Sequence, residues 1–235
     1  MNTILFDLDG TLLPMDVHAF EKIYFGGLCS ILPQMEPKAL IGAVLGGTAA
    51  MAQNDGSCSN REAFIRHFEA ASGLCFAQYE EAFLEYYRTR FGDCRAACRV
   101  TPVSRQIVDI LKAKGYRLAV ATNPMFPQVA THGRLAWLGL TPEDFALVTT
   151  YEDSCRAKPN PAYFAEVCQR LGVEPADCVM VGNDVAEDGA AAELGMPVML
   201  VTDCLMNEKE LPTQNFWQGS LTELLAWAEG LATVS

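Results

Sequence analysis

The chain has 235 residues, half of them hydrophobic and a fifth charged, and this composition excludes disordered, collagen-like and low-complexity proteins. There are 17 Lys and Arg against 29 Asp and Glu, and the resulting net charge of -12 would repel nucleic acid and anionic membranes. The first residues form no signal peptide, and no apolar run approaches the ~18 residues of a membrane-spanning helix. We therefore expect a cytoplasmic protein, monomeric or homodimeric, with no nucleic-acid or membrane partner.

Five short apolar runs are typical of strands in a parallel sheet, because such strands are buried on both faces and lose the alternation of polar and apolar residues. They span residues 3–6, 117–121, 146–149, 178–181 and 197–201. Capping residues and glycines delimit helices over residues 102–114, 161–171 and 185–194, and a last helix from Ser220 onward. This alternation predicts an α/β fold, a doubly wound, Rossmann-like parallel sheet.

Residues 14–99 separate the first strand from the second. They contain helical patterns, for example over residues 60–72 and 76–91, and no convincing strand. A connection of this length is far longer than the few residues that usually join a strand to a helix. The sequence therefore predicts an inserted all-helical domain of residues 14–99, and an α/β core domain of residues 1–13 and 100–235.

Four aspartates follow two of the predicted strands. Asp7 and Asp9 come directly after the first strand, and Asp184 comes after the strand over 178–181. Asp188 lies one turn beyond Asp184 in the expected helix, so the two carboxylates would face the same way. Because ligands bind beyond the carboxyl ends of parallel strands, we expect these side chains to converge at one edge of the sheet.

A hydroxyl, an amide and an ammonium group are expected at the same edge. In Thr122-Asn123-Pro124, Pro124 would begin a helix that Asn123 caps, so that backbone N–H groups and the Thr122 hydroxyl would be available to an anion. Lys158 lies between the third and fourth predicted strands. Each of these residues alone is usually a turn, cap or solvated residue, and it is their coincidence at separate strand ends that indicates a site.

Carboxylates gathered this closely would repel one another, and a divalent cation would relieve the repulsion. Ligation by oxygen alone, from Asp7, Asp184, a backbone carbonyl and water, favours Mg²⁺ over zinc or copper. The cation and Lys158 would together allow this acidic edge to accept a phosphate group.

These residues resemble the four signature motifs of the haloacid dehalogenase (HAD) superfamily. The segment Asp7-Leu8-Asp9-Gly10-Thr11 is similar to the nucleophile motif, Thr122 to the second motif and Lys158 to the third. Gly182-Asn183-Asp184, together with Asp188, is similar to the fourth. The inserted helices resemble the helical C1 cap of the phosphoglycolate phosphatase-like branch, so residues 14–99 would be a cap domain.

The resemblance implies a Mg²⁺-dependent hydrolase of phosphate monoesters that acts on a small phosphorylated metabolite. Asp7 would attack phosphorus to form an aspartyl-phosphate, and Asp9 would act as general acid and then as general base. Lys158 would be a third catalytic residue and would bind the phosphoryl group with Thr122 and Asn123.

The resemblance also implies a metal site made by four aspartates. Asp7, the Asp9 carbonyl and Asp184 would hold the Mg²⁺, and Asp188 would orient a ligand or a metal-bound water.

Several other reactions remain open at the level of sequence. A phosphomutase would use the same core and differ in how the cap excludes water. Asp9 disfavours a dehalogenase, because a departing halide needs no proton donor. Phosphonate hydrolases of the superfamily use a cap lysine, for which Lys22 and Lys38 are the candidates. A non-catalytic binding module is the last alternative.

Overall fold

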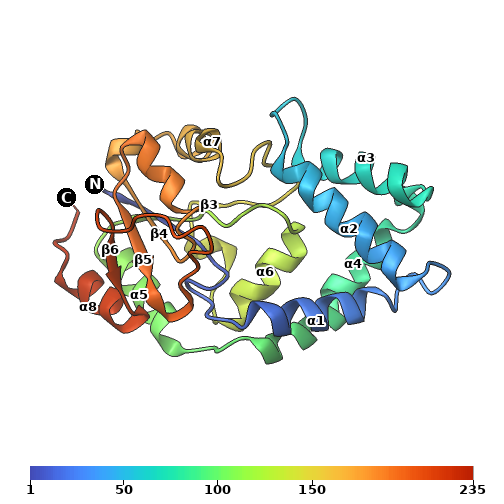
Figure 1. Cartoon of the computed structure of the whole chain (residues 1–235). Coiled ribbons are helices and arrows are strands. Elements are labelled where there is room, and N and C mark those ends of the chain that lie inside the picture. Colours follow the sequence, from blue (N-terminus) through green and yellow to red (C-terminus); the bar gives the residue numbers. More distant parts are fainter. Residues whose placement is uncertain (235) are drawn as a thin grey trace.

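The computed structural model describes residues 1–234, and Ser235, the last residue of the predicted core domain, lies outside the described residues. A six-stranded parallel sheet in the order β3-β2-β1-β4-β5-β6 occupies one part of the molecule (Figure 1). The strands are β1 (Thr3–Phe6), β2 (Arg117–Val120), β3 (Leu147–Val148), β4 (Cys178–Gly182), β5 (Val198–Val201) and β6 (Trp217–Gly219). The five predicted strands are confirmed to within one residue at each end. The sequence pattern does not predict β6, which is short, half-exposed and at the sheet edge.

Helices cover both faces of the sheet, as a doubly wound fold requires. They are α5 (Pro102–Ala113), α6 (Gln128–Trp137), α7 (Pro161–Leu171) and α8 (Leu221–Gly230). Ile4 and Phe6 of β1 belong to the core that contains α5 and α8, whereas Leu5 belongs to the core that contains α7. Burial on both faces explains why β1 is apolar at every position. The predicted helices at 102–114, 161–171 and after Ser220 are confirmed.

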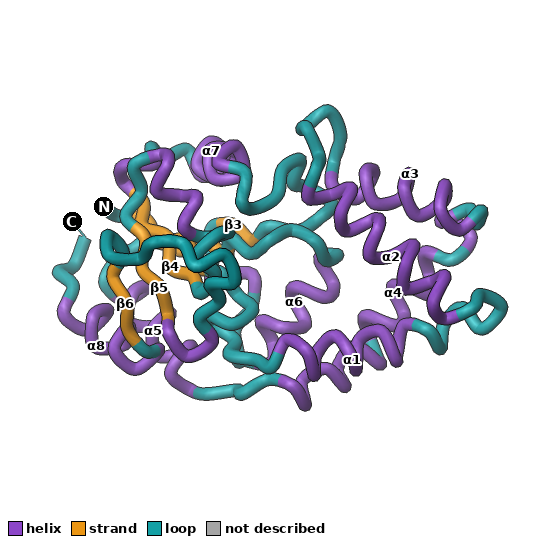
Figure 2. The backbone as a smooth tube through the Cα atoms, in the orientation of Figure 1, coloured by secondary structure: helices purple, strands orange, loops and turns teal. Residues whose placement is uncertain are grey.

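Residues 14–99 contain only helices, turns and loops, apart from one isolated bridge between Met15 and Cys98 that joins the two ends of the segment (Figure 2). The helices are α1 (Val17–Leu28), α2 (Pro37–Ala52), α3 (Asn60–Ser72) and α4 (Glu80–Arg88). The predicted helix over 76–91 divides into a 3₁₀ turn, α4 and the start of a second 3₁₀ segment. An aromatic cluster forms the interior of this part, with Phe64, Phe68 and Phe83 among its members. The same cluster includes Ala130 of α6, so the inserted helices pack against the sheet part of the chain.

Two expected helix positions are wrong. Residues 185–194 do not form an α-helix, because the chain makes turns up to Asp188 and then only a 3₁₀ segment, Gly189–Leu194. The helix expected from Pro124 begins instead at Gln128, with Pro127 as the residue before it. Asn123 is therefore not a helix cap, and no helix N-terminus lies at Pro124.

The register of the sheet aligns the ends of three strands. Phe6 of β1 pairs with Val120 of β2 on one side and with Val181 of β4 on the other. The residues that follow these strands therefore emerge side by side at one edge. Among residues 1–234, no helix has the length and apolar character needed to cross a membrane.

Candidate active site

Asp7 is the first residue after β1, and its side chain lies against a buried lysine. The Asp7 amide donates to the Val181 carbonyl at 2.8 Å, which holds it between two strands. Lys158 Nζ lies 2.9 Å from Asp7 Oδ1 and 2.6 Å from Asp188 Oδ1. Lys158 is 1% exposed and Asp188 is 1% exposed, so one ammonium group is shared between two carboxylates away from water.

Burial and neighbouring charges shift the pKa values of both Asp7 and Lys158. Burial raises the pKa of Asp7 to about 7; Lys158 opposes this shift, whereas Asp188 and Asp9 add to it. Burial by itself would lower the pKa of Lys158, but Asp188 and Asp7 outweigh that effect and raise it above its ordinary value. Lys158 therefore stays positively charged, and any further positive charge near Asp7 would stabilise its ionised form.

The turn after β4 is held together by the Asp188 carboxylate. Asp188 Oδ2 accepts hydrogen bonds from the amides of Asn183 and Asp184, both at 2.9 Å. This carboxylate fills the space beside Gly182, where the Cβ of any other residue would collide with it. Asp184 and Asp188 are thus brought together by a side-chain bond across a turn, and not by the shared helix face that was expected.

Asn183 connects this turn to the segment that follows β1. Thr11 Oγ1 donates to Asn183 Oδ1 at 2.8 Å, and Asn183 Nδ2 donates to the Cys204 carbonyl at 2.9 Å. Gly10 has a φ of 85° and lies so close to the Asn183 side chain that a Cβ would overlap it. A residue other than glycine would therefore be both strained and crowded at this position.

Asp9 lies beyond Asp7 and forms an ion pair with Arg134 of α6. The arginine is 1% exposed, and its guanidinium carbon lies 4.5 Å from the centre of the Phe126 ring. Asp9 Oδ2 takes the ion pair, whereas Asp9 Oδ1 is a buried oxygen with no hydrogen-bond partner within residues 1–234. Arg134 belongs to none of the sequence motifs, and its only signal in the sequence is its position four residues after Ala130 on the buried face of α6.

The segment after β2 supplies Thr122 and Asn123. Thr122 is buried, and its carbonyl accepts hydrogen bonds from the hydroxyls of Thr149 and Tyr163, both at 2.8 Å. Asn123 Oδ1 accepts from the Lys158 amide at 3.2 Å. Asn123 thus ties the segment that carries Lys158 to the strand end, a role different from the helix cap that the sequence suggested.

Glu187 is a second site residue that lies outside the sequence motifs. Asn123 Nδ2 donates to Glu187 Oε1 at 2.9 Å. Burial raises the pKa of Glu187 to about 7, with Lys158 acting in the opposite direction. The only signal in the sequence for Glu187 as a site residue is its position three residues after Asp184.

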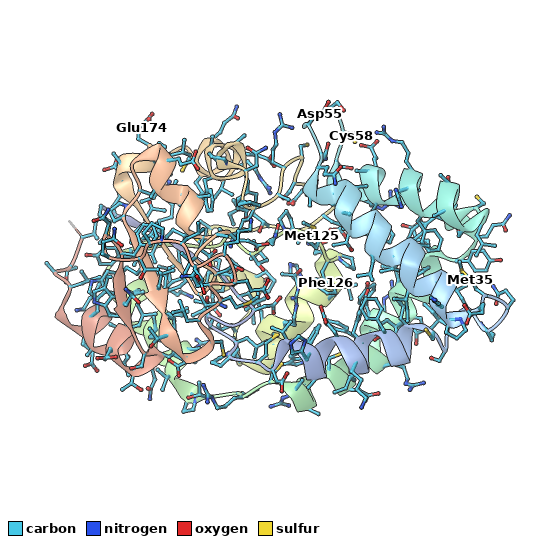
Figure 3. All side chains as sticks on the ribbon, viewed as in Figure 1. Met35, Asp55, Cys58, Met125, Phe126 and Glu174 are labelled. Carbon is cyan, nitrogen blue, oxygen red and sulfur yellow. The ribbon has the colours of Figure 1, made fainter. Side chains whose placement is uncertain are left out.

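One cavity of about 250 Å³ joins these groups. Six of the seven predicted site residues line it, namely Asp7, Asp9, Thr122, Asn123, Asp184 and Asp188. Glu187 lines it as well. The seventh, Lys158, contacts two of them through its ammonium group. The cavity also borders Met125 and Phe126, which lie between the sheet and the inserted helices (Figure 3).

The residues around this cavity fit a hard cation. Asp7 and Asp184 each use one carboxylate oxygen in hydrogen bonds, and the other accepts none from residues 1–234. Both oxygens of Asp188 have protein partners, so it supports the site and does not offer a free ligand. In the described part of the chain, no three His, Cys, Asp or Glu side chains form a ready metal cluster. Mg²⁺ does not need one, because it usually takes one or two carboxylates and completes its shell with water and phosphate oxygens.

Comparison with known proteins agrees with this arrangement. The profile of the family haloacid dehalogenase-like hydrolase matches residues 1–195. A phosphoglycolate phosphatase of Xylella fastidiosa is 29% identical over 203 residues, which cover 84% of this chain and 79% of the relative. A glyceraldehyde 3-phosphate phosphatase of Methanothermobacter thermautotrophicus is 27% identical over 214 residues, which cover 86% of this chain and 85% of the relative.

A solved structure extends the agreement to the fold. The HAD phosphatase from Thermococcus onnurineus matches with a TM-score of 0.62 and 23% identity, covering 100% of both chains. The predicted fold class and the predicted superfamily are therefore confirmed, and the phosphatase relatives support the predicted enzyme class. The chain belongs to the haloacid dehalogenase-like hydrolases, in their phosphoglycolate phosphatase-like branch.

Proposed function

We propose that this protein is a Mg²⁺-dependent phosphatase that hydrolyses a small phosphorylated metabolite through an aspartyl-phosphate on Asp7. The observation that carries the proposal is the placement of Asp7, which borders the cavity and is held at 2.9 Å by the buried Lys158 ammonium. A carboxylate fixed beside a permanent cation can approach a phosphate dianion that it would otherwise repel.

In the first step, an Asp7 oxygen attacks phosphorus, and the bond from phosphorus to the alcohol oxygen breaks. Asp9 gives its proton to the departing oxygen. We assign this proton to Asp9 Oδ1, the oxygen without a protein partner, because Oδ2 is engaged by Arg134. In the second step, Asp9 takes a proton from water, the water oxygen attacks phosphorus, and the bond from Asp7 to phosphorus breaks to release inorganic phosphate.

The remaining residues bind and position. Thr122, Asn123 and Lys158 would bind the phosphoryl oxygens, and Asp188 would hold Lys158 and the Asp184 amide in place. Asp7, Asp184 and the Asp9 carbonyl would hold Mg²⁺, which when bound neutralises charge on the phosphoryl oxygens and completes the binding site.

The test is phosphate release from a set of phosphate monoesters, with Mg²⁺ and with EDTA. We expect activity to disappear in EDTA and to return when Mg²⁺ is added. Asp7→Asn should lower kcat by about 1,000-fold or more, because the amide cannot act as the nucleophile. Asp93→Asn, at an exposed ion pair with Arg90, is the control and should retain full activity.

Two outcomes would contradict the proposal. The first is substantial Mg²⁺-dependent phosphate release by Asp7→Asn. The second is conversion of a sugar phosphate into its isomer without release of inorganic phosphate, which would instead indicate a phosphomutase.

A further inference from the structure

A second cavity, of about 280 Å³, lies inside the inserted helical part, directly beside the phosphate site. Residues of α1, α2, α3 and α4 line it, together with Met125, Phe126 and Pro127. Four residues border both cavities, namely Asp9, Val17, Met125 and Phe126. Because Asp9 borders both, the group that departs from phosphorus would be directed into this second cavity, which we call the cap cavity.

The wall of the cap cavity is mainly aromatic and aliphatic. Phe20, Tyr24, Phe83, Tyr87 and Phe126 are among its aromatic residues. The hydroxyls of Tyr24 and Tyr87 bond to each other at 2.8 Å, and the Thr48 hydroxyl donates to the Val44 carbonyl at 3.1 Å. These polar atoms are therefore already paired and do not require a polar ligand.

The charged residues that line the cap cavity are all acidic. Its charged lining residues are Asp9, Glu21 and Glu80, and none of the lining residues is a lysine or arginine. The nearby cations are already paired with two of these lining acids, Arg61 with Glu80 and Arg134 with Asp9. A carboxylate or second phosphate placed here would lose its hydration and find no unpaired cation among the lining residues.

From this combination we infer that the substrate is a phosphate monoester whose alcohol part is uncharged and apolar, an aryl-alkyl or branched alkyl group. The inference rests on the proposed function and narrows it. It also separates this chain from enzymes that bind substrates carrying a second anionic group, because such a group needs a cation that the cap cavity does not provide. The volume of about 280 Å³ is near the lower end of the range for small-molecule sites, roughly 300 Å³, and suits one ring or a short branched chain.

Three substrates test the inference in wild-type enzyme with Mg²⁺. Benzyl phosphate and its para-carboxylate share the benzyl group and have similar leaving groups, but the para-carboxylate is larger by one carboxyl group and carries one more negative charge. Methyl phosphate reaches only the phosphate site. We expect kcat/KM for benzyl phosphate to exceed that for the para-carboxylate by about 100-fold and that for methyl phosphate by at least about 10-fold.

Two substitutions at Thr48, which lines the cap cavity from α2, link this preference to the cavity. Thr48→Trp fills the space and should lower the ratio of kcat/KM for benzyl to methyl phosphate by about 10-fold or more. Thr48→Lys supplies a cation and should raise the ratio of the para-carboxylate to benzyl phosphate by a similar factor. Thr222→Trp, at an exposed position of α8, is the matched control and should leave both ratios unchanged.

The outcomes distinguish this inference from the function on which it rests. If methyl phosphate is hydrolysed but the para-carboxylate is as good a substrate as benzyl phosphate, the apolar specificity is wrong and the phosphatase stands. Unchanged kcat/KM ratios in both Thr48 variants would likewise overturn the inferred apolar specificity. If none of the three esters releases phosphate, the proposed function itself fails.

Discussion

Arg134 is the residue that most clearly separates this active site from a simple set of motifs. Its guanidinium is 1% exposed, contacts the Phe126 ring and pairs with Asp9 across 125 positions in the sequence. A buried arginine is costly unless its charge is matched, so the ionised form of Asp9 has a structural function in addition to the proposed proton transfer. Arg134 is a positioning residue, because it acts through Asp9 and does not border either cavity.

A double-mutant cycle would measure this interaction. For Asp9→Ala and Arg134→Met we expect a coupling free energy of unfolding of about 2 kcal/mol, because the charge left after either single change is poorly solvated. The value should be below that of a fully buried pair, since the Asp9 side chain is 30% exposed. Urea unfolding of the four proteins gives the measurement.

The matched control is the surface pair Arg105 and Asp109, with a distance of 2.8 Å and side chains 39% and 50% exposed. Its coupling should be no more than about 0.5 kcal/mol, because exposed pairs are screened by water and salt. Equal coupling in the two cycles would mean that the Arg134 pair is no stronger than a surface ion pair.

At the scale of elements, the turn after β4 determines where the Lys158 ammonium lies. Gly182 ends β4, and the Asp188 carboxylate returns to fill the space beside it. The same carboxylate binds Lys158 with one oxygen and two backbone amides with the other. One glycine thus allows a single aspartate to join a strand end, a turn and the proposed catalytic lysine.

Gly182→Ala should therefore displace Asp188 and release Lys158 from its position. We expect kcat to fall by about 10-fold or more, since misplacement of a catalytic group by an ångström carries a cost of this order or larger. Steady-state kinetics with a phosphate ester gives the measurement.

Gly133→Ala is the control, because Gly133 lies in α6 and a Cβ there meets nothing within 4 Å. It should stabilise the protein by roughly 0.5–1 kcal/mol, as alanine favours a helix more than glycine does, and leave kcat unchanged. Wild-type kcat in Gly182→Ala would show that Asp188 does not position the site.

At the scale of the whole molecule, Asn60 connects the inserted helices to the sheet part. It begins α3 and is fully buried. Its side-chain amide donates to the Arg156 carbonyl at 3.0 Å and to the Pro124 carbonyl at 3.4 Å, and its backbone amide donates to the Ser154 carbonyl at 2.8 Å. These bonds hold the insertion beside the loops that follow β2 and β3, next to the proposed substrate cavities.

Asn60→Leu should destabilise the protein by at least about 2 kcal/mol, because it leaves buried carbonyl groups without donors. Thermal or urea unfolding measures the loss. Asn215→Leu, at an exposed position, should change the free energy of unfolding by no more than about 0.5 kcal/mol. Wild-type stability in Asn60→Leu would contradict the view that these bonds anchor the insertion.

Local patterns in the sequence were sufficient for five of the six strands of the parallel sheet and for most of the groups that surround the proposed phosphate site. Strands such as β1 and β4 are buried on both faces, so their continuous apolar runs mark them, and the carboxyl ends of parallel strands meet at one edge. For that reason Asp7 and Asp184 were predicted to converge, and both border one cavity. The division into a core and a cap domain and the roles of the individual residues remain predictions.

Other features depend on contacts between residues far apart in the chain, and only the tertiary structure decided them. The segment over 185–194 has the composition of a helix, yet its Asp188 side chain folds back to the amides of Asn183 and Asp184, which precede the segment, and binds the distant Lys158. The pairing of Asp9 with Arg134 and the acidic, aromatic cap cavity bring together segments that no local periodicity relates. The sequence by itself therefore determined the chemistry at the strand ends, whereas long-range packing decided the proton-transfer environment and the shape of the space for the substrate.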